Sequence, residues 1–298
     1  EETDFESLGG AQVHLNLSGT AHLITKKEED ALVLARYVLG YLPSNNIDNA
    51  PIKVIDDEPN RLAQDLNSLV PEDPGMPYSM HTAIETVVDK GSFLELQAGY
   101  ARNAIVGLGR FDGMPVGIIA QEPSVMAGVI DIDAADKICR TVRFCDAFNL
   151  PLVTFVDSPG FLPGVSQEHG GIIRHGAKVL FAYSEANVPK VSVVTRKAYG
   201  GAYVVMSSKY LGTDINYAWP SAEIAVMGPG GATNILYRKE LAEAEDPQAE
   251  RERLEAEYRK RYLTPYAAAE AGYVDDVIEP AETRPRIIKA LRAIQHKS

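Results

Sequence analysis

The stretch from Arg196 to Tyr203, with the sequence RKAYGGAY, carries the residue types best suited to chemistry in this chain. It follows a β-branched run, 191–195, that predicts a strand, and it leads into a segment, 202–209, that predicts a helix. Glycine lets a ligand approach the backbone closely, and the first amides of a helix are unpaired donors at the positive end of its dipole. The pair Gly200 and Gly201 therefore predicts a turn that can bind a developing oxyanion.

Helices and strands alternate around this turn. Hydrophobic periodicity predicts, in order, helix 134–148, strand 152–156, helix 171–185, strand 191–195, helix 202–209 and strand 224–227. This alternation implies parallel pairing, right-handed crossovers and ligand sites at the carboxyl ends of the strands, where both the glycine turn and the motif 157–160 lie. Further upstream, Asp112-Gly113 predicts a two-residue hairpin between 103–111 and 114–120.

Three further motifs accompany the glycine turn in a fixed order: DSPGFLPG at 157–164, QEHGGIIRHGAK at 167–178 and AWPSAEIAVMG at 218–228. Together with the turn they closely resemble the carboxyltransferase subunit of biotin-dependent acyl-CoA carboxylases. Methylmalonyl-CoA decarboxylase and transcarboxylase are relatives with the same pattern. The resemblance covers nearly the whole chain, but only the second half of that family's usual polypeptide.

The resemblance implies an α/β chain with the crotonase-like (ClpP/crotonase) fold, in which helical crossovers join parallel strands. Residues 69–298 would be the C-terminal carboxyltransferase domain. Residues 1–68, with a helix predicted at 27–42 and a Pro-, Asp- and Asn-rich boundary at 49–77, would be the tail of the N-terminal half and a linker. The chain begins with Glu1 rather than Met, so we expect a proteolytic fragment, a deliberately prepared piece or one part of a split subunit.

The resemblance also implies the chemistry, which is movement of a carboxyl group between carboxybiotin and the α-carbon of a short acyl-CoA. Propionyl-CoA with methylmalonyl-CoA, or acetyl-CoA with malonyl-CoA, would be the substrate pair. The backbone amides of Gly201 and Ala202 would bind the ureido oxygen of biotin, which is attached to a carrier protein or domain. The implied partners are the biotin carboxyl carrier, the biotin carboxylase subunit and further copies of the chain in a homo-oligomer.

Five residues beside these amides are candidates for a biotin or acyl pocket. Tyr199 and Gly200 immediately precede the donors, and Gly160 and Phe161 follow the strand at 152–156. The prolines around Gly160 could equally do no more than stiffen a surface turn. Val204 would point towards the acyl chain, although ordinary helix packing explains an apolar residue there as well.

Composition narrows the classes of function. The chain has 298 residues, of which 45% are hydrophobic and 23% charged, and a net charge of -12, which argues against a nucleic-acid-binding surface. The two cysteines, Cys139 and Cys145, are six apart on one predicted helix and predict core thiols rather than a disulfide or metal site. The sequence contains no run of about 20 apolar residues, which is the pattern that would predict a membrane span. We expect a cytoplasmic protein without a metal.

Two other functions remain open. A crotonase-type hydratase or isomerase acting on acyl-CoA needs a carboxylate at the pocket, for which Glu168 and Glu223 are the candidates. A catalytically incomplete fragment could instead serve as an assembly or biotin-docking module, because the donors for the thioester would lie in the N-terminal half. Arg174, His175 and Lys178 could bind CoA phosphates, but a solvated helix face is the more common role for such residues.

Overall fold

An eight-stranded sheet forms the centre of the protein, whose computed structural model describes residues 1–295. The strand order is β1-β2-β3-β4-β5-β6-β8, and β7 pairs with β5 outside this path. The first three strands are antiparallel, and all later pairs are parallel. The strands are β1 Leu94–Leu96, β2 Ala104–Phe111, β3 Met114–Gln121, β4 Leu152–Ser158, β5 Lys190–Tyr199, β6 Ile215–Ala218, β7 Glu223–Ala225 and β8 Asp276–Val277.

Helices cover both faces of the sheet. One apolar cluster joins α5 (Ile132–Ala147) and α7 (Ile172–Glu185) to side chains such as Val106 on β2, whereas a second joins α4 (Met80–Val87) and α13 (Thr283–Ile294) to alternate side chains such as Ile105. This alternation is the period of two that a strand buried on both faces requires. The other helices are α1 Phe5–Gly9, α2 Ala11–Asn16, α3 Glu28–Leu39, α6 Val165–Gly170, α8 Gly200–Val205, α9 Pro229–Leu236, α10 Arg238–Glu243, α11 Pro247–Tyr262 and α12 Pro265–Glu270.

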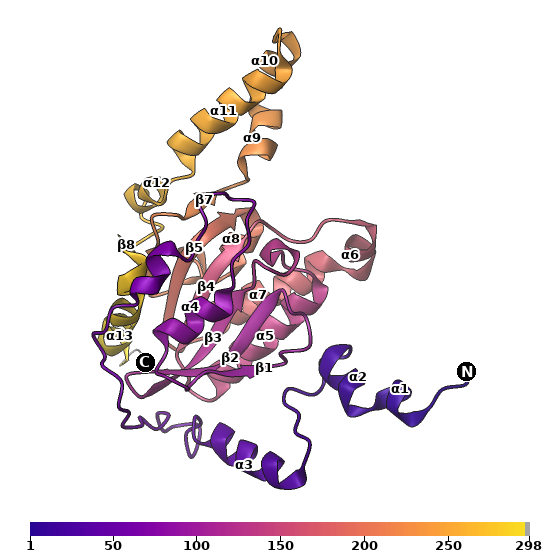
Figure 1. Ribbon diagram of the computed structural model, residues 1–298, viewed down its shortest axis with the longest axis vertical. Coiled ribbons are helices and arrows are strands. Elements are labelled where there is room, and N and C mark those ends of the chain that lie inside the picture. The colour runs from indigo at the N-terminus through magenta and orange to yellow at the C-terminus, as the bar shows by residue number, and fades with distance from the viewer. Residues whose placement is uncertain (296–298) are drawn as a thin grey trace.

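Two groups of helices extend away from this layered body. Figure 1 shows α9, α10 and α11 projecting from one end of the sheet, and α1, α2 and α3 lying along the opposite end. The predicted helix 27–42 is confirmed as α3, but much of its apolar stripe does not pack on the body, since Leu32 and Leu39 are 60% and 64% exposed. Only Val38 and Leu42 from this stripe contact the core.

The predicted hairpin between β2 and β3 is confirmed. Asp112 and Gly113 have φ values of 52° and 76°, the left-handed pair that lets a two-residue turn follow the strand twist. The buried carboxylate of Asp89 accepts hydrogen bonds from both turn amides, at 3.0 and 2.9 Å. The turn is therefore fixed by a side chain that follows α4 as well as by its own sequence.

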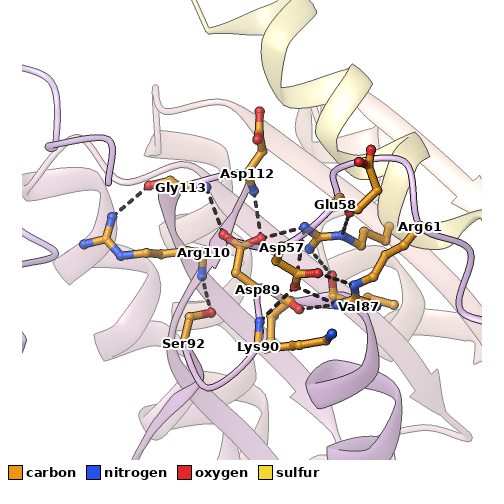
Figure 2. A network of polar contacts seen from close by, with 12 residues as sticks. Asp57, Glu58, Arg61, Val87, Asp89, Lys90, Ser92, Arg110, Asp112 and Gly113 are labelled. Carbon is orange, nitrogen blue, oxygen red and sulfur yellow. Dashed lines mark hydrogen bonds and ion pairs between the residues drawn. The ribbon is translucent and has the colours of Figure 1, made fainter. Parts of the chain in front are cut away.

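Asp89 belongs to a buried ionic network that ties distant parts of the chain together (Figure 2). Arg284 of α13 lies 2.8 Å from the Asp89 carboxylate and 3.7 Å from that of Asp57, and it also donates to the carbonyl of Val87. Arg61 pairs with Asp57 at 2.7 Å. The segment before α4 is therefore attached to both the hairpin and the C-terminal helix.

The predicted strands and helices around the glycine turn are largely confirmed, with three differences. Strand β5 continues to Tyr199, and a separate helix, α6, precedes α7. The predicted helix at 202–209 is present, but its bounds were wrong, because α8 begins at Gly200 and ends at Val205. The chain turns there since Ser207 adopts a φ of 52° and Ser208 donates its hydroxyl to the carbonyl of Val204 at 2.7 Å. The short strand β6 gave no clear pattern in the sequence and was not predicted.

Candidate active site

Strand β5 carries a bulge next to the end of β4. Val156 pairs with Val194 and Ser158 pairs with Ala198, so β5 advances four residues while β4 advances two. Extra residues in one strand increase the local twist and change the direction of the strand. Beyond the bulge, β5 pairs with β7 instead of β6, with Tyr199 opposite Ala225.

A buried carboxylate occupies this bulge. Asp157 accepts a hydrogen bond from the amide of Lys197 at 3.1 Å and from Nε of Arg196 at 3.0 Å. Its own amide donates to the Gln121 side chain at 3.1 Å. Burial raises the pKa of Asp157 above its ordinary value, and the neighbouring Arg196 opposes that rise. The carboxylate thus satisfies backbone and side-chain donors that the irregular pairing leaves without a strand partner.

Arg196 also attaches a segment from before α4 to the edge of the sheet. Its guanidinium lies 4.9 Å from the centre of the Tyr78 ring and donates to the carbonyl of Met76 at 2.8 Å. Lys197 donates to the carbonyl of Pro74 at 2.8 Å. Sequence reasoning missed this role of Asp157 and Arg196, because their pairing depends on strand register rather than on any local pattern.

The glycine turn follows directly from the redirected end of β5. Gly200 has a φ of 55°, and a Cβ atom there would lie 2.8 Å from the carbonyl oxygen of Val226, so this position requires glycine. Gly201 is exposed and has no such strain, while the side chain of Ala202 is buried. Helix α8 has no side-chain N-cap, so its first amides donate no hydrogen bond to the side chain of the N-cap residue, Tyr199.

Phe161 lies beside this turn. A Cβ atom on Gly201 would stand 3.7 Å from its ring, and one on Gly176 of α7 would stand 2.8 Å from it. The half-buried ring therefore lies between α7 and the start of α8. Gly160, with a φ of 151°, precedes it, and a β-bridge to Ile130 fixes the backbone. The structure thus brings Gly160 and Phe161 next to the turn.

Two other predicted pocket residues, Tyr199 and Val204, are less accessible to solvent than Gly201. Tyr199 is 7% exposed, and its ring belongs to a small apolar cluster with Tyr258 and Leu263. Its hydroxyl donates to Glu223, and burial together with that bond raises the pKa of Tyr199, so the hydroxyl stays protonated. Val204 is half buried on α8.

The candidate acid and phosphate-binding residues are engaged elsewhere or exposed. Glu223 is bound by Tyr199 and by Arg259, and Glu168 is exposed on α6. His175 and Lys178 both contact the Asp136 carboxylate, at 3.0 and 2.8 Å, and so join α7 to α5. Arg174 is exposed on the same helix.

A further titratable cluster, which the sequence did not reveal, lies at the start of α4. His81 contacts Glu122 through Nδ1 at 2.9 Å and Glu95 through Nε2 at 3.0 Å. These two contacts raise the pKa of His81 to about 9. Burial alone would raise the pKa of Glu122. Hydrogen bonds from His81 and Ser124 outweigh burial and lower this pKa to about 2.

The contribution of His81 to stability should depend on pH. The folded pKa of His81 is above that of an unfolded histidine, about 6.5, so its ion pairs stabilise fully below that value and are lost as the pH rises towards 9. The His81→Gln variant should therefore be less stable than the wild type at about pH 6. The difference in free energy of unfolding between the two proteins should shrink by about 1 kcal/mol as the pH rises to about 9.5. The change is small because the ring is 36% exposed. Urea unfolding at several pH values measures it, and parallel pH profiles for the two proteins would contradict it.

Among residues 1–295, no group of three or more His, Cys, Asp or Glu side chains is arranged to hold a metal ion. Within the same range, no helix is long and apolar enough to cross a membrane. Cys139 and Cys145 both lie on α5, as predicted, and are unpaired.

A mostly parallel sheet with helical crossovers, and a glycine turn at its carboxyl edge, define a crotonase-like α/β protein, which confirms the predicted fold class. Residues 1–298 match the family model described as the carboxyl transferase domain. The chain therefore belongs to the carboxyl transferase domain family, and the predicted relationship is confirmed.

Named relatives are consistent with this membership. The chain is 56% identical to the carboxyltransferase subunit of propionyl-CoA carboxylase from Haloferax mediterranei over 297 residues, which cover 100% of the chain and 58% of the relative. It is 52% identical to the biotin-dependent acetyl-/propionyl-coenzyme A carboxylase beta5 subunit from Mycobacterium leprae, with coverage of 100% and 56%. The solved hexamer of transcarboxylase 12S with methylmalonyl-CoA and methylmalonic acid bound superimposes with a TM-score of 0.96 at 48% identity, over 100% of the chain and 57% of that protein. The chain thus spans a little over half the length of these relatives.

Proposed function

We propose that this chain supplies the biotin-binding half of a biotin-dependent acyl-CoA carboxyltransferase site. The observation that carries the proposal is the exposed Gly201 at the uncapped start of α8, with the Phe161 ring beside it. The absence of a Cβ leaves room for a ligand oxygen at the amides of Gly201 and Ala202, and an aromatic ring covers one side of that space. A ureido group needs such donors and biotin needs an apolar wall, so the residues present fit it.

In this proposal the chain's own groups act mainly by position. Bound biotin supplies the activated carboxyl group and the nitrogen that receives the α-proton. The amides of Gly201 and Ala202 donate to the ureido oxygen as it gains negative charge, and they need little reorganisation because the folded backbone already orients them. Phe161 limits the access of water, and no side-chain base is required. Gly160, Tyr199 and Gly200 shape the turn, and Val204 contacts the acyl chain.

The substrate in this proposal is a short acyl-CoA. The relatives' names support propionyl-CoA or acetyl-CoA as acceptor, with methylmalonyl-CoA or malonyl-CoA as the carboxylated partner. The donors for the thioester belong to an N-terminal half, of which residues 1–68 are the tail. The partners are a biotin carboxyl carrier, a biotin carboxylase subunit and further copies of the chain, in the cytoplasm and without a metal. The second candidate is an assembly or biotin-docking module.

The test is carboxyl transfer by the protein that joins this chain to its N-terminal half. With methylmalonyl-CoA and free biotin, we expect biotin-dependent release of propionyl-CoA. A separate assay of crotonyl-CoA hydration by the same protein tests the alternative function as a crotonase-type hydratase. Hydration without carboxyl transfer would overturn the proposal, and neither reaction would favour a module without catalysis. We expect transfer because Tyr199 and Arg259 engage Glu223, and Glu168 is exposed to solvent on α6.

A further inference from the structure

The helices that project from the sheet meet the body at the glycine turn. We call residues 229–262, which form α9, α10 and α11, the helical arm; it extends away from the sheet in Figure 1. At its base, Ala232 and Tyr258 of the arm pack with Tyr199 and Leu263 in a separate apolar cluster. Tyr199 is the residue immediately before Gly200. One side chain thus joins the arm to the turn.

Polar contacts join the same parts. The Tyr199 hydroxyl donates to one oxygen of Glu223, and the other oxygen of Glu223 accepts from Arg259 near the end of α11. The Glu223 side chain is only 18% exposed and that of Arg259 is 39% exposed. A partly buried pair of this kind is held more firmly than a surface pair, because solvent screens it less.

The backbone of β7 completes the connection. Its central residue, Ile224, donates its amide to the carbonyl of Leu263 at the end of α11, at 3.3 Å. The residue after β7, Val226, places its carbonyl oxygen against Gly200. The turn is therefore bounded by β7 and by the segment that leads into the arm.

Local structure alone does not fix this turn. Helix α8 has six residues and no side-chain N-cap. Beyond its bulge, β5 pairs with β4 at Ala198 alone and otherwise with the three-residue strand β7. Oxyanion donors act well only when neighbouring side chains hold them within about 0.5 Å of the productive geometry. The contacts of Tyr199 with the arm supply such support.

We infer that Glu223 and Arg259 are positioning residues, which act through Tyr199 so that the helical arm sets the geometry of the Gly201 and Ala202 amides. This inference rests on the proposed function of those amides. Neither residue touches the substrate or biotin. Breaking the contact should lower the rate of carboxyl transfer and leave the binding of acyl-CoA unchanged.

The test compares two arginines of α11 in the protein that carries both halves. Arg259→Met removes the pair with Glu223, whereas Arg253→Met removes exposed pairs with Glu250 and Glu257 on the same helix. We expect kcat to fall about tenfold for Arg259→Met with the KM for methylmalonyl-CoA unchanged, no change for Arg253→Met, and partial recovery for Arg259→Lys. Glu223→Gln, which keeps the shape of the side chain, should show the same split.

Amide hydrogen exchange gives a readout that does not depend on activity. Exchange in the hydrogen-bonded segments that flank the free donors, residues 197–199 of β5 and residues 204–205 of α8, should accelerate in Arg259→Met and Glu223→Gln, and remain at the wild-type rate in Arg253→Met. Unchanged exchange and unchanged kcat in both variants would overturn the inference. A wild-type protein without carboxyl transfer would defeat the proposed function instead, and the exchange comparison would still decide whether the arm positions the turn.

Discussion

Replacing Gly201 by valine should lower the rate of carboxyl transfer by about 10²- to 10³-fold while leaving the protein folded. The backbone at Gly201 is not in the left-handed region, and a Cβ atom would meet only the Phe161 ring, at an ordinary 3.7 Å. The fold therefore tolerates the side chain. Its two methyl groups, however, would cover the amides of Gly201 and Ala202 and fill the space towards Phe161.

The matched control is Gly230→Val. Gly230 is the second residue of α9, as Gly201 is of α8, and a Cβ atom there would meet only the end of the Glu255 side chain, at 3.5 Å. We expect this variant to retain activity. Transfer from methylmalonyl-CoA to free biotin by the protein that carries both halves, with circular dichroism to check folding, measures both. Activity near the wild-type level in folded Gly201→Val would remove the oxyanion role of these amides.

Replacing Asp157 by asparagine should lower the free energy of unfolding by about 3–5 kcal/mol. The carboxylate is fully buried and accepts from Arg196 and from the amide of Lys197. Asparagine would turn an NH2 group towards one of these donors and leave the buried Arg196 charge without its partner. Because the bulge depends on this carboxylate, the turn beyond it should lose its geometry as well.

Denaturant unfolding measures this effect, with Glu185→Gln as the control. Glu185 pairs with Arg143 on the surface, where both side chains are more than 60% exposed, so this control should change stability by less than about 0.5 kcal/mol. A loss of stability in Asp157→Asn no larger than that of the control would show that the buried pair does not hold the bulge.

The sequence predicted the parts of the site that depend on local pattern. The β-branched run 191–195 and the glycine pair lie only four residues apart, so a strand, a turn and a helix were predicted in the correct order. The hairpin at Asp112-Gly113 was found for the same reason. The bounds of the strand and the helix differ, because β5 continues to Tyr199 and α8 spans Gly200–Val205. Phe161 was proposed as a pocket residue from its place after the strand at 152–156, and the structure places its ring beside Gly201.

The supporting contacts could not be predicted, because they depend on register between distant segments. Asp157 meets Arg196 only because β5 bulges against β4, and His81 reaches Glu122 across 41 positions of sequence. Glu223 was weighed as a catalytic acid, but its partners Tyr199 and Arg259 lie 24 and 36 positions away. Periodicity carries no information about such pairings.

Titration of this chain with biotin tests the central proposal most directly, which is that residues 1–298 hold the donors for biotin and that the donors for the thioester belong to an N-terminal half. NMR or calorimetry should detect weak binding, with amide shifts at Gly201 and Ala202 that are lost in Gly201→Val. A carboxyl-transfer assay on the same sample should show no turnover of methylmalonyl-CoA, because catalysis requires both sets of donors around one reaction centre. Efficient turnover by this chain alone, or tight binding of acyl-CoA with no response to biotin, would contradict the account.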